Sequence, residues 1–373
     1  MNSFRIKRYY FRYITVAGLV LLLAGCDMKD DYSDCPTTGG FEISVVYTQN
    51  KNNLNEFAEE VSRMDFFFFD ENGLFKERVT DVEGPFTNDY SKTFQLPYGK
   101  YQAVLWGNLY DDTELVGELK KDTTTIDELR LKLKTQSSKD TKTETPYQEV
   151  LSKLENYVAP IPTTLFWGNV ETVQILSGHH VKKEVDLLKN THDIHVTLRW
   201  KNYEGFYCFS TEHQKRTRAY IAGTNGDMTF GNELVRERNI AYIPMYRDPA
   251  HPDIYAGQTG LSYIPPQLVI DGIAAVMPDA RTMRLMADGS TEKLVVTTVQ
   301  DDGTEKIMYT RSIVDLIRLT GHYNTQQSLD WCNDYNVVVD FRCIDSNHNH
   351  GSAWVAITIW INGWIVKEIN EEI

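Results

Sequence analysis

Short apolar segments with a two-residue period, separated by turn residues, recur along most of this 373-residue chain. Phe41–Thr48 alternates, Met64–Phe69 is continuously apolar, and Trp354–Ile361 and Trp364–Ile369 flank the dipeptide Asn362-Gly363. Alternation separates the two faces of a strand, and Asn-Gly accepts the positive φ of a type I′ hairpin. The Met64–Phe69 run must be buried on both faces, because an exposed run would promote aggregation. The pattern predicts packed β-sheets rather than alternating helices and strands.

Two short helices are expected among the strands. Asn53–Val61 begins with Asn53 as a capping residue, and Glu56 follows at the capping-box position. Ser312–Leu319 begins at a capping serine and ends before Gly321.

The length of the chain suits about two domains of ordinary size. A new alternating strand, Ile194–Trp200, starts just after Lys189-Asn190. We therefore expect an N-terminal sandwich at 41–190 and a C-terminal sandwich at 191–373.

The N-terminus has the order of a secretion signal. Basic residues from Arg5 to Arg12 precede an apolar segment, Ile14–Ala24, which is shorter than the roughly 20 residues of a membrane-spanning helix. The segment ends in Leu23-Ala24-Gly25-Cys26, which resembles a bacterial lipobox. That resemblance implies a signal peptide at 1–25, removed before Cys26, and three acyl chains on the new N-terminal cysteine. An ordinary signal with an incidental cysteine is the alternative.

Residues 26–40 read as an acidic tether. Each buried CH₂ of an acyl chain contributes about 0.8 kcal/mol, so three chains hold a protein firmly to a bilayer. The run Lys29, Asp30 and Asp31 resembles the signal that carries lipoproteins of Bacteroidota to the outside of the outer membrane. A merely solvated tether remains the alternative.

Charge and cysteine content limit the partners. The chain has a net charge of −14 and no basic cluster after its signal, which argues against binding nucleic acid or anionic headgroups. With Cys26 acylated, four cysteines remain, for which three pairings exist. We favour a disulfide between Cys332 and Cys343; buried free thiols at Cys208 and Cys343 are the alternative.

Several motifs occur together in a fixed order after the lipobox cysteine. They are Asp34-Cys35-Pro36, MDFFFFDENGLF (64–75), LPYGKYQAVLWGNL (96–109), LFWGN (165–169), DIHVTLRW (193–200) and INGW (361–364). This order resembles the FimB/Mfa-type fimbrial anchor lipoproteins of Bacteroidota, over nearly the whole mature chain.

The resemblance implies an all-β fold of two tandem transthyretin-like β-sandwich domains with short helices in the connections. It implies an outer-membrane lipoprotein at the base of a type V fimbria, with stalk subunits as partners and a role in ending fibre growth. Stalk subunits of this kind lose their first strand to an Arg-directed protease. An anchor does not need the resulting groove, so Phe41–Thr48 should stay in place.

The C-terminal strand has two interpretations. Trp364, Ile365, Val366 and Ile369 could enter a stalk subunit as a donated strand. Alternatively the hairpin completes its own sheet, which the tight Asn362-Gly363 turn favours.

Motifs for catalysis or cofactor binding are absent from the sequence, and we expect no enzyme activity, cofactor or metal. His192, Asp193 and His195 are closely spaced, as are His348 and His350, but surface histidines are commoner than metal ligands.

Two other functions compete with that of a fimbrial anchor. One is a stalk or tip subunit, whose mature chain would start near Met64 or Val79.

The other competing function is a surface glycan-binding lipoprotein, which needs exposed aromatic residues. We expect Trp331 to be exposed and the strand tryptophans to lie in the core, namely Trp106, Trp167, Trp200, Trp354 and Trp360.

Overall fold

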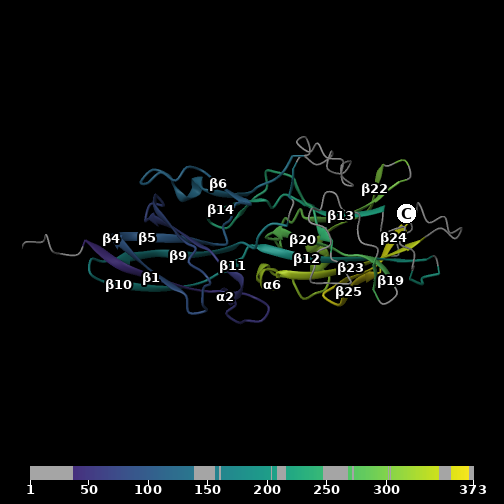
Figure 1. Cartoon of the computed structure of the whole chain (residues 1–373), viewed down its shortest axis with the longest axis horizontal. Coiled ribbons are helices and arrows are strands. Elements are labelled where there is room, and N and C mark those ends of the chain that lie inside the picture. Colours follow the sequence, from purple (N-terminus) through teal and green to yellow (C-terminus); the bar gives the residue numbers. More distant parts are fainter. Residues whose placement is uncertain are drawn as a thin grey trace, which may run out of the picture.

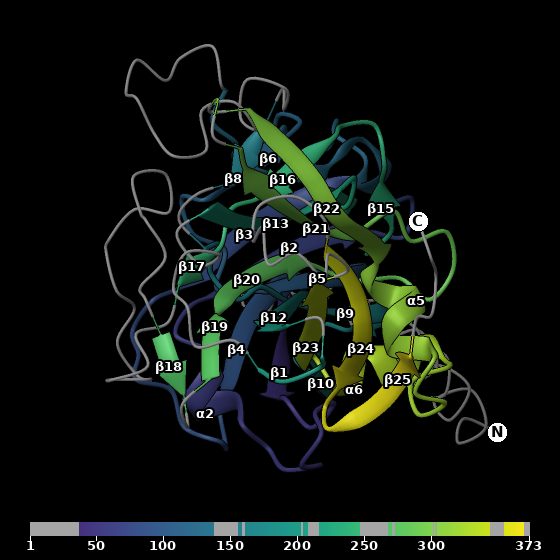
Figure 2. The ribbon, with the colours of Figure 1, turned by 90° about the vertical axis from the view of Figure 1, so that its right-hand side faces the viewer.

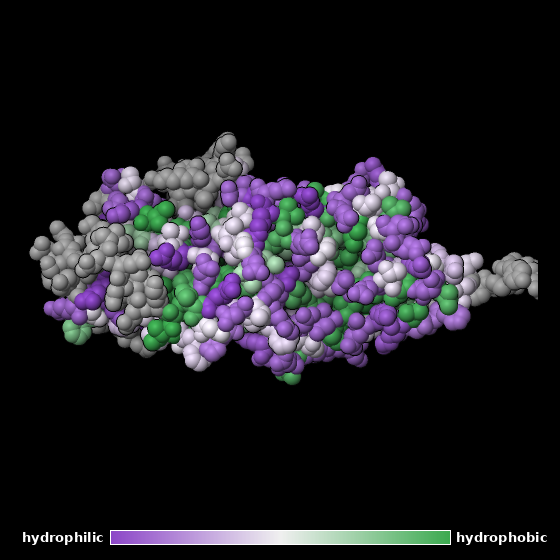
Figure 3. Space-filling model, turned by 180° about the vertical axis from the view of Figure 1, so that it is seen from behind, coloured by the Kyte–Doolittle hydropathy of each residue, from purple (hydrophilic) through white to green (hydrophobic). Residues whose placement is uncertain are grey.

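The computed structural model describes residues 37–137, 156–158, 161–202, 204–207, 216–246, 268–270, 273–300, 302, 304–343 and 354–368. It confirms the all-β expectation. Two sandwiches follow one another along an elongated molecule, with short helices in the connections (Figure 1). On the face seen in Figure 3, hydrophobic residues are interspersed with hydrophilic ones along the length of the molecule.

The N-terminal sandwich packs a three-stranded sheet on a five-stranded sheet. The first contains, in order, β10 (His180–Asp186), β1 (Thr38–Val46) and β4 (Ser91–Pro97). The second contains β11 (Leu188–Lys189), β9 (Phe166–Ile175), β5 (Gly99–Gly107), β2 (Met64–Asp70) and β3 (Phe75–Asp81). Side chains from both sheets form one buried core.

The position of strand β2 between two cores explains why its sequence is continuously apolar. Phe66 and Phe68 point into the N-terminal sandwich, where Phe68 lies 4.8 Å from Phe94 between ring centroids. Phe67 and Phe69 point to the opposite face and pack on Phe230, a residue of the second half of the chain. The expected burial of this run on both faces is confirmed.

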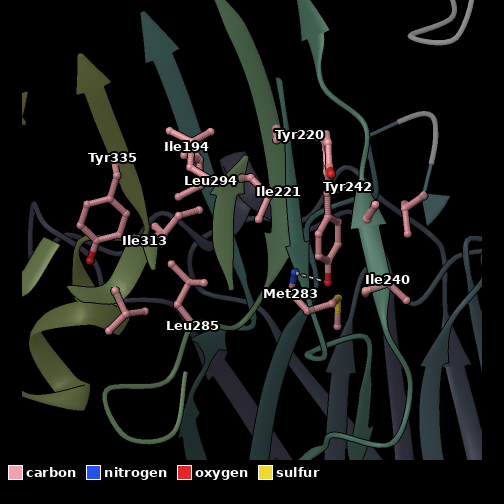
Figure 4. Close-up of a cluster of buried hydrophobic side chains, with 14 of the residues drawn as sticks. Ile194, Tyr220, Ile221, Ile240, Tyr242, Met283, Leu285, Leu294, Ile313 and Tyr335 are labelled. Carbon is pink, nitrogen blue, oxygen red and sulfur yellow. Dashed lines mark hydrogen bonds between the residues drawn. The ribbon is translucent and has the colours of Figure 1, made fainter. Parts of the chain in front are cut away.

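The C-terminal sandwich packs an eight-stranded sheet on a five-stranded sheet. The larger sheet runs β17 (Met245–Tyr246), β20 (Pro278–Met283), β12 (Thr191–Lys201), β23 (Asp334–Cys343), β24 (Trp354–Ile361) and β25 (Trp364–Glu368), with β19 (Ile273–Val276) on β12 and β18 (Leu268–Ile270) on β19. The smaller sheet runs β22 (Glu305–Ser312), β21 (Lys293–Val299), β13 (Thr217–Gly223), β16 (Ile240–Tyr242) and β8 (Tyr157–Val158). Figure 4 shows side chains from both sheets meeting in the core, where the backbone N–H of Met283 donates to the Tyr242 hydroxyl at 3.3 Å.

Segments of the first half also pair with the second half. A small sheet joins β6 (Thr113–Val116) and β7 (Arg130–Leu133) to β14 (Asp227–Thr229) and β15 (Leu234–Val235). Strand β8 lies parallel to β16 in the C-terminal sandwich. The core of the second half therefore continues onto the outer face of the N-terminal sandwich. The domain boundary between residues 190 and 191 stays a prediction.

The helix expected at Asn53–Val61 is wrong in its extent and its cap. Only α2 (Phe57–Glu60) is helical, Asn53 has a φ of 51°, and Leu54 is exposed. Asn50 instead donates from its side chain to the carbonyls of Tyr47 and Leu54. Asparagine side chains compete in this way with helical hydrogen bonds, which shortens the helix.

The other expected helix is confirmed. Helix α5 (Ile313–Arg318) begins after Ser312, whose hydroxyl accepts a hydrogen bond from the Asp315 N–H at 3.2 Å. A further helix, α6 (Gln326–Trp331), was not expected. It is capped by Thr325, and Ser328 is at the reciprocal position.

Removal of one core ring tests the packing of the N-terminal sandwich. Phe68→Ala should lower the free energy of unfolding by about 3–5 kcal/mol, because a fully buried ring leaves a cavity. Leu54→Ala, at an exposed side chain, should change it by less than about 0.5 kcal/mol. Urea-induced unfolding measures both; equal effects would contradict the packing described.

Candidate interaction surface

The C-terminal hairpin is fastened to its own sandwich at its turn. Asn362 and Gly363 have φ values of 48° and 84°, as a type I′ turn requires, so the predicted hairpin is confirmed. The Asn362 side-chain oxygen accepts from the Asn336 N–H at 2.7 Å, and its amide donates to the Tyr323 hydroxyl at 3.1 Å. These bonds tie the turn to the start of β23 and to the segment before α6.

Strand β25 lies at the open edge of the eight-stranded sheet, and within the described ranges it pairs only with β24 (Figure 2). Trp364 and Ile365 are 53% and 58% exposed. The His322 ring lies 4.3 Å from the Trp364 ring between centroids. We call His322, Trp364 and Ile365 the edge patch. Val366 packs on the core, and Ile369 lies outside the described residues.

Strand β1 fills the middle of the smaller N-terminal sheet. It runs parallel to β10 and antiparallel to β4, with Phe41 facing Val181 on one side and Phe94 on the other. Phe41, Ile43 and Val45 are completely buried. The N-terminal sandwich is therefore closed by a strand of its own chain.

Both arginines that precede the candidate processing sites are held on the sheet by Asp65. Arg63 Nε lies 2.8 Å from Asp65 Oδ2, and Arg78 Nη2 lies 2.8 Å from Oδ1. The Asp65 side chain is fully buried, as is Met64, the residue after Arg63. A protease needs an extended, accessible segment. The peptide bond after Arg63 lies at the start of β2 and the one after Arg78 lies inside β3, so neither is accessible in this way.

Limited proteolysis tests this protection. An Arg-specific protease should leave the bonds after Arg63 and Arg78 intact in the folded protein and cut both after urea unfolding. Asp65→Ala removes the shared carboxylate and should expose the two arginines to cleavage. Mass spectrometry of the fragments identifies the cuts; cleavage of the folded wild type after Arg63 or Arg78 would contradict the arrangement.

A polar cleft of about 300 Å³ lies between the two sandwiches, and residues of both halves of the chain line it. Across it, Lys51 Nζ lies 3.0 Å from Asp334 Oδ2, and the Asn333 amide donates to the Tyr47 hydroxyl at 2.9 Å. Both bonds join the first half of the chain to the second. We call this region the junction cleft.

His195 lines the junction cleft between two carboxylates. Its Nδ1 lies 3.0 Å from Asp279 Oδ1 and its Nε2 lies 3.2 Å from Asp334 Oδ1. Hydrogen bonding to Asp279 and then to Asp334 raises the pKa of His195 to about 9. His195 in turn holds the pKa of Asp334 well below its usual range. His195 is therefore a cation at neutral pH.

His192 has a different role. Burial lowers the pKa of His192 to about 4, so the ring is neutral and its Nδ1 accepts from the Leu285 N–H at 3.2 Å. The two histidines are three residues apart on β12 and so face opposite sides of the sheet. In the described part of the chain, no three His, Cys, Asp or Glu side chains gather as a metal site. His348 and His350 lie outside the described residues.

The pKa of His195 predicts how stability depends on pH. Because the folded-state pKa is above the ordinary value of 6.5, the stabilisation is complete below pH 6.5 and is lost as the pH rises through about 9. The free energy of unfolding should fall by on the order of 2 kcal/mol over this window. His195→Gln should abolish that fall, whereas His179→Gln, at an exposed ring, should keep it. Urea unfolding at pH 6.5 and 9.5 measures the free energy of unfolding of each protein. If it falls as much in His195→Gln as in the wild type, the assignment is contradicted.

The favoured disulfide is not formed. Cys332 is a free thiol after α6, whereas Cys343 ends β23. At roughly 3.3 Å per residue, the strand from Asp334 to Cys343 holds them about 30 Å apart, far beyond the roughly 6 Å between the Cα atoms of a disulfide. The expected disulfide requires the two cysteines to lie on neighbouring strands, but they lie near opposite ends of one strand.

The lipid-related residues, Cys26, Lys29, Asp30 and Asp31, lie outside the described residues. Among the residues that are described, no helix has both the length and the apolar character to cross a membrane.

This chain is similar to known proteins in both sequence and fold. The family model of fimbrillin-A associated anchor proteins Mfa1 and Mfa2 matches residues 32–370. The minor fimbrium anchoring subunit Mfa2 of Porphyromonas gingivalis is 22% identical, covering 99% of this chain and 98% of that protein. The solved structure of the fimbrial anchor protein Mfa2 from the same species superimposes with a TM-score of 0.64 at 17% identity, over 89% of this chain and 100% of that one.

A DUF1812 protein from Bacteroides thetaiotaomicron superimposes with a TM-score of 0.65 at 20% identity, over 89% of this chain and 99% of the other. At these identities the superpositions establish a shared fold. The family match, which extends from the segment before β1 to the end of β25, goes further: this chain belongs to the family of fimbrillin-A associated anchor proteins.

Proposed function

We propose that this fimbrial protein is the lipid-attached anchor of its fimbria and ends the fibre at the cell surface. The observation that carries the proposal is the position of β1, which is paired on both sides and fully buried at Phe41, Ile43 and Val45. A sandwich that keeps its first strand has no open groove for the strand of another subunit. Growth of the fibre therefore stops at this subunit.

The attachment to the outer membrane is proposed to run through acyl chains on Cys26. The lipobox-like sequence and the short apolar segment before it support this, and Lys29, Asp30 and Asp31 support export to the outer surface. Strand β1 starts at Thr38, twelve positions after Cys26 in the sequence.

Removal of the acylation site tests the anchor. Cys26→Ala should abolish incorporation of radiolabelled palmitate and release assembled fimbriae into the medium, because nothing else in the proposal holds them. Cys332→Ala, which removes the free thiol after α6, should leave both unchanged. Fimbriae that stay attached to cells carrying Cys26→Ala, at normal protein levels, would contradict the proposal.

The contact with the stalk is proposed to use the open edge of β25. Its outer backbone groups can pair with an added strand, and the exposed edge patch supplies apolar contacts. Because the Asn362 turn is tied to β23 and Tyr323, β25 would receive a strand in place rather than leave its sheet. This favours the sheet-completing interpretation of the hairpin over strand donation.

Two substitutions on β25 test this contact. Trp364→Lys with Ile365→Lys should weaken binding of the stalk subunit at least about tenfold, since charges on an edge strand oppose addition of another strand. The matched control is Ile307→Lys on the edge strand β22, where Ile307 is 59% exposed. Calorimetric titration measures the affinities, and equal losses in both variants would exclude β25 as the contact.

The competing stalk or tip function fits less well. Maturation after Arg63 or Arg78 would remove β1, and those bonds lie at buried or paired positions around Asp65. The relatives of this chain are structural proteins of fimbriae, which supports a function without catalysis.

A further inference from the structure

An open groove lies on the outer face of the N-terminal sandwich, away from its core. Strands β5 and β9 form its floor, Ile126 of the 3₁₀ helix η2 (Ile126–Glu128) forms one wall, and Phe230-Gly231 after β14 forms another. Its volume is about 530 Å³, within the range of small-ligand sites. We call it the β9 groove. Its floor strands, β5 and β9, lie in the N-terminal sandwich, whereas β25, which carries Trp364 and Ile365 of the edge patch, lies in the C-terminal one (Figure 1).

A β-bulge shapes the floor of the groove. Tyr101 pairs with Val173 and Ala103 pairs with Val170, so the register between β5 and β9 shifts there. As a result Glu171 and Thr172 stand opposite Gln102 alone. Bulges bend a strand and redirect its side chains, and they are frequent beside binding sites.

The LFWGN motif divides between the core and the groove. Phe166 points inward and is fully buried, and Gly168 has no room for a side chain, since a Cβ there would lie 2.5 Å from Val185 Cγ1. Trp167 and Asn169 alternate to the outer side and line the groove. Trp167 is half-buried rather than a core residue, which corrects the expectation from the sequence.

The indole of Trp167 is held in place at the groove wall. Its Nε1–H donates to the Phe230 carbonyl at 3.0 Å, which fixes the ring. Next to it, Asn169, Glu171 and Thr172 are exposed, and their side chains have no hydrogen bond or ion pair within the described part of the chain. A fixed aromatic ring thus stands beside unpaired amide, carboxylate and hydroxyl groups.

We propose that the β9 groove binds a neutral glycan. Trp167, with Ile126, offers apolar surface to the C–H face of a sugar ring, while Gln102, Asn169 and Glu171 offer donors and acceptors to its hydroxyls. Among the described residues that line the groove there is neither Lys nor Arg, so none of them offers a cation to a sulfated, phosphorylated or uronic sugar. Glu171 would repel such acidic sugars.

Binding of defined tetrasaccharides tests the proposal. The full-length lipoprotein in a sugar-free detergent is titrated with mannotetraose, cellotetraose, maltotetraose and xylotetraose, and with tetragalacturonate as the acidic probe. We expect saturable binding of at least one neutral probe, with a change in tryptophan fluorescence. Asn169→Ala with Glu171→Ala should raise the Kd at least tenfold without a change in melting temperature. Thr172→Ala, which removes the unpaired hydroxyl of the groove, is a second variant that should also raise the Kd without such a change.

The matched control is Phe206→Ala, at an exposed aromatic ring in the second half of the chain, which should leave the Kd unchanged. Three results would overturn the proposal: no binding of any neutral probe, binding that survives the groove variants, or binding of tetragalacturonate alone. The outcome is independent of stalk binding, because the β25 variants leave the groove intact.

Discussion

Strand β1 forms backbone pairs with β10 on one side and β4 on the other, and its apolar side chains fill the interior of the N-terminal sandwich. Burial of each large apolar side chain contributes about 1.5–3 kcal/mol. Loss of the strand would therefore remove three such side chains, at Phe41, Ile43 and Val45, and expose two rows of unpaired backbone groups. The proposal that growth of the fibre ends at this subunit follows from this closed state.

The same strand connects the proposed lipid to the folded protein. A pull on the fibre would reach the membrane through β1, where the hydrogen bonds of two ladders share the load. Before it reaches β1, such a load passes from the C-terminal sandwich to the N-terminal one. Strand β7 pairs with β14, Lys51 pairs with Asp334, and the Phe67 ring packs on Phe230. The two halves are thus joined by a sheet, an ion pair and a common core.

Local patterns predicted the strands well. The Asn362-Gly363 hairpin, the doubly buried Phe66–Phe69 run and the Ser312 cap each depend on neighbouring residues, and each is confirmed. Helix Asn53–Val61 failed because asparagine side chains satisfy the backbone without a helix. Helix α6 has a Thr325–Ser328 capping pair that could have revealed it.

Features that depend on tertiary contacts were not accessible from the sequence. The pairing of Cys332 with Cys343 assumed two strands where there is one. His195 gains its role from Asp279 and Asp334, which lie 84 and 139 positions further along the chain. The groove beside Trp167 arises where a segment from the second half lies against the first sandwich. The periodicity of apolar residues along a short segment does not reveal contacts between residues so far apart in the chain.

The most direct measurement is the intact mass and N-terminal peptide of the protein isolated from outer membranes together with assembled fimbriae. The account predicts a chain that begins at a triacylated Cys26 and retains Thr38–Val46. A chain that begins at Met64 or Val79, without acyl groups and without β1, would contradict it.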